Sequence, residues 1–149
     1  MALVLGNTCT ANYNSGTAAS PTWVPIPMVG DVTVNLECGE AEIDLRISNW
    51  ILNLPAKLSG TVDLALANDI GGTVFDVLRT QFFARTQKQF AFGDAAIATS
   101  GTEFFKAFAF FSSFPWNQAT QEVSNHDASL SLGYTEESAA LVEPAWATT

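Results

Sequence analysis

Apolar and polar residues alternate along residues 31–50, and the alternation changes phase in the middle. Apolar side chains stand at even positions from Val32 to Cys38 and at odd positions from Ala41 to Ile47, with Gly39 and Glu40 between the two runs. Alternation with a period of two predicts a strand that is buried on one face. The change of phase indicates that the chain does not continue as one regular strand.

Two structures explain this change of phase. In a tight hairpin with Gly39 and Glu40 as its central residues, all the apolar side chains share one face and Glu37 lies across from Glu42 on the other. Glycine at the first central position suits a type II′ turn, so the hairpin is our first interpretation. A β-bulge at Gly39 within one bent strand also fits the pattern, and the sequence leaves both open.

The first 30 residues are rich in Thr, Ala, Asn, Ser and Pro. The stretch 12–22 has the composition of a loop, and 23–30 is typical of an extended segment. Prolines at positions 25 and 27 exclude a central strand there, so an edge strand or an arm onto a neighbouring molecule is expected. We therefore predict an N-terminal arm or loop over 1–30, followed by a single β-rich domain over 31–149.

One helix is predicted, from Thr73 to Gln87, after a further strand over 54–69. Thr73 and Asp76 resemble a capping box, in which the Thr oxygen accepts a hydrogen bond from a free helix amide. At 100° per residue an apolar stripe forms that should face the core; it contains Val74, Phe75, Val77, Leu78 and Phe82. Phe83 lies outside this stripe, where a loop shields it or a neighbouring molecule contacts it.

Further strands are predicted over 88–98 and 102–114. The second is apolar on both faces, because Phe104, Phe108 and Phe110 point one way while Phe105 and Phe111 point the other. A strand that faces water on one side avoids this pattern, so a second sheet, the helix or a neighbouring subunit must cover it.

The end of the chain reads as two last strands over 120–125 and 128–135, followed by an irregular segment over 136–149. The order of strands, one helix, then strands predicts a mainly β (α+β) fold. We expect a β-sandwich or barrel with one flanking α-helix and an extended N-terminal arm.

The composition points to contacts with protein rather than with nucleic acid. Charged residues make up 14% of the 149 residues, whereas a typical soluble domain has about 25%. The net charge of −9 argues against a surface that grips nucleic acid, since such surfaces neutralise phosphates with Lys and Arg. Part of this weakly charged surface is therefore expected to meet other protein molecules.

The sequence contains no recognisable catalytic or metal-binding pattern. Nucleophile elbow, phosphate-binding loop and metal-ligand spacing are absent. Its single histidine, His126, is expected at the surface, while Cys38 is in phase with core residues and Cys9 has no evident role. We predict no enzyme activity, no catalytic residue, no cofactor and no metal.

Membrane insertion by this chain is not expected either. The first residues form no signal peptide, and the longest apolar run, at 107–111, is too short to cross a bilayer. We expect a soluble protein that is made in the cytoplasm.

Three stretches carry a resemblance to a known family. These are the arm that leads into TWVPIPMVGDVTVNLECGEAEIDLRISNW, the passage from strand through ND to helix at 62–87, and EPAW near the C-terminus. In them the chain resembles the tail tube (major tail) proteins of long-tailed bacteriophages. The resemblance implies homohexameric rings that stack into a tube, located in the virion tail and conducting the viral genome into the host.

The same resemblance implies partners and roles for particular residues. The partners are copies of the chain itself, other tail proteins, and double-stranded DNA that passes through the lumen without tight binding. An acidic lumen wall is expected to contain Glu37, Glu40, Glu42 and Asp44. Contacts between subunits are expected at Trp23, Val24, Ile26, Phe83, Phe105 and Phe111.

A function from another class also fits the sequence. A small β-sandwich module could bind a ligand or glycan by stacking it on surface tryptophans; the chain has Trp23, Trp50, Trp116 and Trp146. The state of association separates the two hypotheses, because a stable monomer at high concentration favours the binding module.

Overall fold

A computed structural model describes residues 9–27, 29–67, 72–116, 118, 120, 125–133, 135–137 and 140–149. It contains ten strands and one helix in these ranges. In chain order they are β1 (Thr10–Asn14), β2 (Trp23–Pro25), β3 (Val29–Asp44), β4 (Ile51–Ala67), α1 (Thr73–Ala84), β5 (Lys88–Gly93), β6 (Glu103–Ser113), β7 (Asn125–Leu132), β8 (Thr135–Glu137), β9 (Ala140–Val142) and β10 (Ala145–Thr148).

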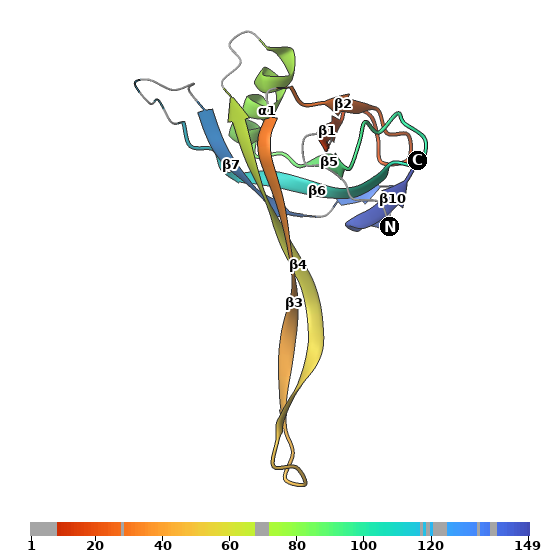
Figure 1. The fold of residues 1–149 in the computed structure, drawn as a ribbon, viewed down its shortest axis with the longest axis vertical. Coiled ribbons are helices and arrows are strands. Elements are labelled where there is room, and N and C mark those ends of the chain that lie inside the picture. Colours follow the sequence, from red (N-terminus) through yellow and green to blue (C-terminus); the bar gives the residue numbers. More distant parts are fainter. Residues whose placement is uncertain are drawn as a thin grey trace.

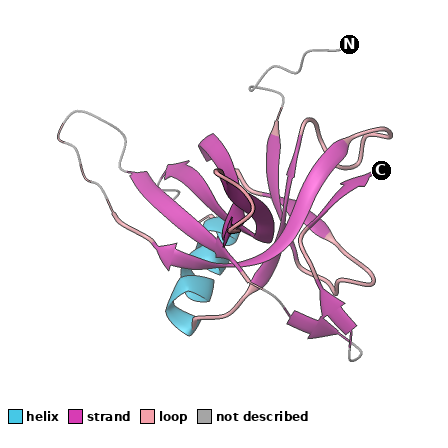
Figure 2. Ribbon diagram, turned by 90° about the horizontal axis from the view of Figure 1, so that it is seen from below, coloured by secondary structure: helices cyan, strands magenta, loops and turns pink. Residues whose placement is uncertain are grey.

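Most strands belong to one antiparallel sheet with the order β2-β1-β5-β6-β7-β4-β3. β10 pairs with β6 beside this path, and β8 and β9 form a separate pair. The large sheet curls, and α1 packs against it (Figures 1 and 2). The predicted mainly β fold with one flanking helix is confirmed.

The core lies between the curled sheet and α1. Its largest fully buried side chains come from three strands and the helix, and they are Val62, Leu64 and Leu66 of β4, Leu78 of α1, Phe90 of β5 and Leu130 of β7. In this part of β4 the intervening Thr61 and Asp63 are exposed, as period-2 alternation predicts.

The helix is shorter than predicted and begins without the expected side-chain cap. Gly72 is its N-cap and makes no side-chain cap hydrogen bond, so Thr73 is the first helical residue. The helix ends at Ala84, where Arg85 takes the left-handed conformation with φ of 58° and closes the C-terminus through its N–H. Asp76 still lies in the favourable first turn, and its Oδ1 is 2.7 Å from Arg79 Nη2.

The segment predicted as a loop over 12–22 and an extended stretch over 23–30 contributes two strands, β1 and β2, to the sheet. β1 lies between β2 and β5, with Ala11 and Tyr13 buried. Its polar character misled the prediction, because the buried Asn14 is satisfied internally: Oδ1 accepts from the N–H groups of Gly16 and Thr22, and Nδ2 donates to Gln89. β2 is an edge strand, as its proline predicts.

Strand β6 is covered by its own chain on one face and only in part on the other. Phe105, Ala107, Ala109 and Phe111 form the more buried row, and Trp146 of β10 lies 5.5 Å from Phe105 between ring centroids. On the other face Phe104 packs against Trp23, while Phe108 is half-buried and Phe110 is 37% exposed.

This arrangement corrects two predictions. Phe105 and Phe111 were expected to meet a neighbouring subunit, but burial inside the chain leaves them no surface to offer. The C-terminal segment was expected to be irregular, yet its last residues form β10 and pair with β6 from Ala145↔Lys106 to Thr148↔Glu103. The predicted strand at 120–125 lies largely outside the described residues.

Candidate assembly surface

Strands β3 and β4 leave the body of the molecule as a long two-stranded ribbon (Figure 1). They pair with each other from Val29↔Leu66 to Asp44↔Ile51. On its other edge β4 pairs with β7 only over Thr61–Ala67. Beyond Gly60 the ribbon therefore has only these two strands, and it ends in the turn formed by residues 45–50.

The predicted turn at Gly39 and Glu40 is wrong, and a bulge lies at this position but on the partner strand β4, not at Gly39 in β3 as the alternative had it. β3 runs through Gly39 without interruption, and the register shifts between Cys38↔Leu58 and Glu40↔Pro55. The additional residue belongs to β4, because Ala56 and Lys57 together face Gly39. A Cβ on Gly39 would lie 3.2 Å from the carbonyl oxygen of Lys57, so the bulge brings the two backbones close together.

The register also changes the partners of the acidic residues. Glu37 lies across from Ser59 and Glu42 lies across from Asn53, so the expected carboxylate pair does not form. Side chains alternate along a strand, so Glu37 and the trio Glu40, Glu42 and Asp44 occupy opposite faces of the ribbon. All four side chains are exposed.

Large apolar side chains of the ribbon are exposed to solvent, although a monomer seldom exposes a large contiguous apolar patch. Leu58 is 81% exposed and Ile47 in the turn is 94% exposed. Seven others share this property, namely Val32, Leu36, Leu45, Trp50, Ile51, Leu52 and Leu54. Cys38, predicted to be buried, is exposed for the same reason: it lies beyond the edge of the core. The ribbon is therefore the leading candidate for an interaction surface.

The remaining predicted contact residues differ in how much surface they offer. Ile26 is buried in the core, and its N–H donates to the Ala11 carbonyl. Trp23 and Val24 are half-buried, and the Trp23 ring packs edge-on against Phe104 at 6.0 Å. Phe83, at the end of α1, is 75% exposed and is the best placed of the set for contact with another molecule.

The only histidine is buried rather than exposed. His126 in β7 is 5% exposed, and its ring lies 4.7 Å from Phe114 and 5.2 Å from Phe75 between centroids. Its Nδ1 is 3.1 Å from the carbonyl oxygen of Pro115. The polar sequence around it gave no sign of this, because the aromatic rings that enclose it come from α1 and from the residues after β6.

The four tryptophans lie on separate elements, which does not favour a stacking platform. Trp50 is in the ribbon turn, while Trp116 lies against His126 at 5.9 Å and Trp146 lies against Phe105. Trp23 packs on Phe104, as described above. Each of the three outside the ribbon thus has a different aromatic neighbour.

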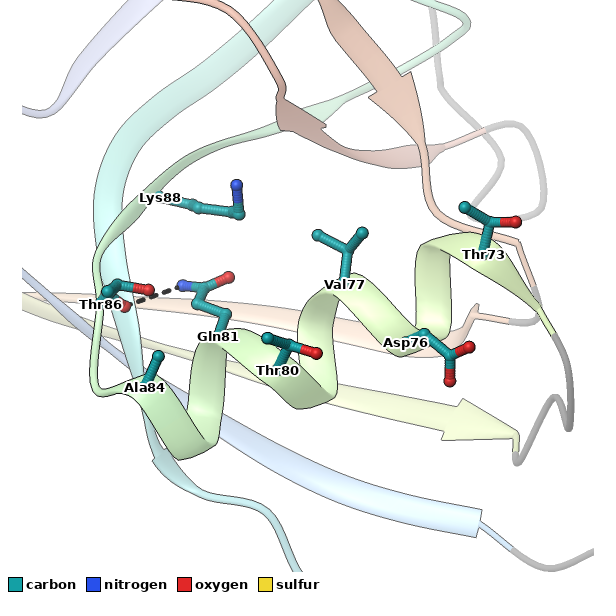
Figure 3. A pocket seen from close by; sticks show the side chains of 8 residues that line it. All are labelled: Thr73, Asp76, Val77, Thr80, Gln81, Ala84, Thr86 and Lys88. Atoms are coloured by element: carbon teal, nitrogen blue, oxygen red, sulfur yellow. Dashed lines mark hydrogen bonds between the residues drawn. The ribbon is translucent and has the colours of Figure 1, made fainter.

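A pocket of about 490 Å³ runs along α1 (Figure 3). Its lining consists of Thr73, Asp76, Val77, Thr80, Gln81, Ala84, Thr86 and Lys88. The buried Gln81 amide donates to the Thr86 and Ala109 carbonyls, which ties the helix to β6. Asp76 is paired with Arg79, and Lys88 Nζ lies 5.6 Å above the Tyr13 ring, so the charged groups are engaged locally.

The described residues hold neither a metal cluster nor a membrane-spanning helix. Within them, no group of three or more His, Cys, Asp or Glu side chains is arranged to hold a metal ion. No helix in the same part of the chain is long and apolar enough to cross a membrane.

Comparison with known proteins relates the chain to others through its fold. No family model matches the sequence, and no curated protein matches it. Among solved structures, the chain is similar to the SPP1 tail tube protein, with a TM-score of 0.69 and 16% identity over 87% of this chain and 76% of that one.

Two further structures extend the similarity. A tail protein of an empty gene transfer agent particle, refined with C6 symmetry, has a TM-score of 0.69 and 12% identity over 95% of this chain and 98% of its own. The tube-terminating cap of the anti-feeding prophage has a TM-score of 0.70 and 9% identity over 100% and 93%. The fold is therefore that of tail tube proteins, as the sequence resemblance predicts.

Proposed function

We propose that this chain is a structural, self-assembling subunit of a tail tube. The observation that carries the proposal is the ribbon of β3 and β4, which projects exposed apolar side chains away from a tail tube fold. An isolated two-stranded ribbon is marginally stable in water, so a surface that packs on it stabilises it. The role is structural, and no reaction is assigned to the chain.

The partners of this surface are copies of the same chain. Head-to-tail contact joins two different patches on neighbouring copies. It gives a closed ring when the rotation from one copy to the next adds up to a full turn, and an open filament when it does not. The ribbon is one such patch, and the exposed Phe83 and Phe110 mark candidates for the other. We propose hexameric rings stacked into a tube, for which the C6 symmetry of the gene transfer agent tail is the support.

The acidic ribbon residues are proposed to face the lumen. Glu40, Glu42 and Asp44 share one face of the ribbon, and all are exposed. Repeated around each ring, they would repel the phosphates of double-stranded DNA, which suits a conduit because Lys or Arg would form counterion-releasing contacts with the passing genome. Glu37, on the opposite face, contributes to this wall only if the ribbon twist brings it there.

The assembled tube belongs, in this proposal, to a virion tail that delivers a genome into a host. The chain is made in the host cytoplasm and joins caps, baseplate and other tail proteins by contact with the ends of the tube. The support is the range of tail assemblies with this fold, which includes a tube-terminating cap.

Negative-stain microscopy and sedimentation of the purified protein test the proposal. We expect tubes whose amount rises with protein concentration. The matched control is a variant in which residues 39–57 are replaced by Asn-Gly, so that Cys38 and Leu58 flank a two-residue turn. This variant should remain folded and monomeric. A wild-type protein that stays monomeric at high concentration would contradict the proposal and favour a binding module.

A further inference from the structure

The ribbon carries its apolar side chains on different faces in its two halves. We call residues 32–38 with 58–64 the proximal ribbon, and residues 40–44 with 51–55 the distal ribbon. In the proximal ribbon the apolar pairs include Val34↔Val62 and Cys38↔Leu58. In the distal ribbon they are Ala41↔Leu54 and Ile43↔Leu52.

The register places these two sets on opposite faces. Ala41 is three positions after Cys38, and β3 has no bulge between them, so their side chains point to opposite faces. Cross-strand partners share a face, so Leu58 follows Cys38 and Leu54 follows Ala41. The bulge at Ala56 and Lys57 makes this possible, because the apolar residues of β4 keep even positions throughout.

The proximal apolar face is a continuation of the core. Val34 packs against the main core cluster, and Val62 is fully buried. A Cβ on Gly60 would lie 2.7 Å from Leu132 Cδ1 and 2.9 Å from Leu36 Cδ2, so these side chains already meet over this glycine. The body of the chain thus covers the inner end of this face, at Val34 and Val62, while Leu36 and Leu58 farther out are 51% and 81% exposed.

Within the described residues, the distal ribbon contributes no side chain to either core cluster. Leu52 and Leu54 are about half exposed, at 48% and 52%. Their face is backed by an acidic face with Glu40, Glu42 and Asp44. The ribbon is therefore amphipathic. Its apolar face is stabilised by contact with another apolar surface, whereas its acidic face is stable in water.

We infer that the distal ribbon docks its face of Ala41, Ile43, Leu52 and Leu54 on a second copy of this chain, and that the phase change at Gly39 with its matching bulge selects this face. The inference rests on the proposed tube function. The distal ribbon lies roughly 7 to 20 Å beyond Cys38, at about 3.3 Å per residue, which takes it away from its own body. A second copy supplies weakly charged, apolar surface, whereas the acidic face repels the same copies.

A variant that lacks the irregular position of the ribbon tests which face docks. We call this the one-step variant, because it shortens β3 by one residue. Removing Gly39 together with Ala56 and Lys57 keeps every other cross-strand pair but turns the distal ribbon over, so that Ala41 and Leu54 join the face of Cys38. We expect this variant to stay folded and to lose assembly, with the critical concentration for tubes raised at least about tenfold.

The matched control shortens β3 by two residues instead of one. Deleting Gly39 and Glu40 together with Pro55, Ala56 and Lys57 shortens the ribbon further but leaves Ala41 and Leu54 on their native face. If the face decides docking, this control assembles better than the one-step variant. If length alone decides, the control assembles worse, and the inference is overturned.

The two failures are distinguishable in the same measurements. Absence of tubes from the wild-type chain contradicts the proposed function. Wild-type tubes together with normal tubes from the one-step variant overturn only the choice of face. Circular dichroism and denaturant unfolding of each variant establish that the body is folded, and a Leu52→Ser plus Leu54→Ser variant, which keeps the ribbon length, should reproduce the loss of assembly.

Discussion

At the scale of single residues, the phenylalanines of β6 differ in burial. A buried ring stabilises the fold, whereas an exposed ring is available for contact with another molecule. Phe111 is 7% exposed and its ring packs edge-on against Phe90 and Phe114. Phe110, its neighbour in sequence, points to the other face and keeps more than a third of its surface. Phe111 thus contributes to the core, while the adjacent Phe110 offers surface to another molecule.

We predict that Phe111→Ala lowers the free energy of unfolding by about 3 to 5 kcal/mol, because it removes buried surface and leaves a cavity. Phe110→Ala, the matched control, should cost less than about 2 kcal/mol, since its ring is only partly buried. Denaturant unfolding of both variants gives the comparison. Equal losses would mean that the two faces of β6 are equally important to the core.

Gly60 offers a second prediction at this scale. A Cβ on Gly60 would lie close to Leu132 and Leu36, and it would also lie 3.0 Å from the carbonyl oxygen of Asn35. Gly60→Ala should therefore destabilise the fold by about 1 to 3 kcal/mol through overpacking. Gly30→Ala is the control, because its Cβ would meet Ala65 Cβ at an ordinary 3.5 Å. Thermal or denaturant unfolding measures both, and similar stabilities would contradict the expected crowding.

At the scale of elements, the ribbon and the body differ in how they are held. Thr61–Ala67 of β4 has a strand on each side and contributes fully buried leucines to the core. The distal ribbon has one pairing edge and exposed side chains on both faces. Pro55 is tolerated there because no third strand needs its missing N–H.

Hydrogen exchange is expected to separate these two parts of the same strands. In free subunits the amides of residues 40–55 should exchange much faster than those of Thr61–Ala67, since local opening exposes no core. In assembled tubes the distal ribbon should become protected, because a neighbouring copy packs on it. Rapid exchange that persists in the tubes would show that the ribbon stays uncovered.

At the scale of the whole molecule, low charge content and an acidic balance act together. With 6 basic and 15 acidic residues, the chain has few charged side chains, and its excess charge is negative. Its acidic side chains on the ribbon are exposed, so they remain hydrated in an assembly with a water-filled lumen.

Charge reversal tests the proposed lumen wall. Particles that carry Glu42→Lys should assemble but release DNA more slowly at low salt, because each ring gains attraction to phosphate. Added salt should restore the rate, since the Debye length falls to about 8 Å at physiological ionic strength. The measurement is the rate of DNA release as a function of salt.

Two further reversals make this test specific. Glu37→Lys places the new charge on the opposite face of the ribbon, and Glu103→Lys places it on the exposed start of β6. Both should release DNA at nearly the normal rate. A normal rate for Glu42→Lys at low salt, or equal slowing by all three, would remove the acidic wall from the proposal.

The sequence by itself determined those features that local periodicity encodes. Alternation along 62–66 and the apolar stripe of 74–82 place the right residues in the core, and the order of elements gives the fold class. The phase change at Gly39 was also legible, but the hairpin and the bulge in β3 that were offered to explain it are both replaced by a bulge in β4. Low charge content pointed to protein contacts without saying where they lie.

Tertiary structure decided where the bulge lies, because strand pairing depends on residues far apart in the chain. β3 continues past Gly39 since β4 offers it partners as far as Ile51. The same long-range pairing draws β1 into the sheet, encloses His126 among rings from other elements, and covers Phe105 with Trp146. Burial is a property of these distant neighbours, and alternation along one strand specifies a face without specifying what covers it.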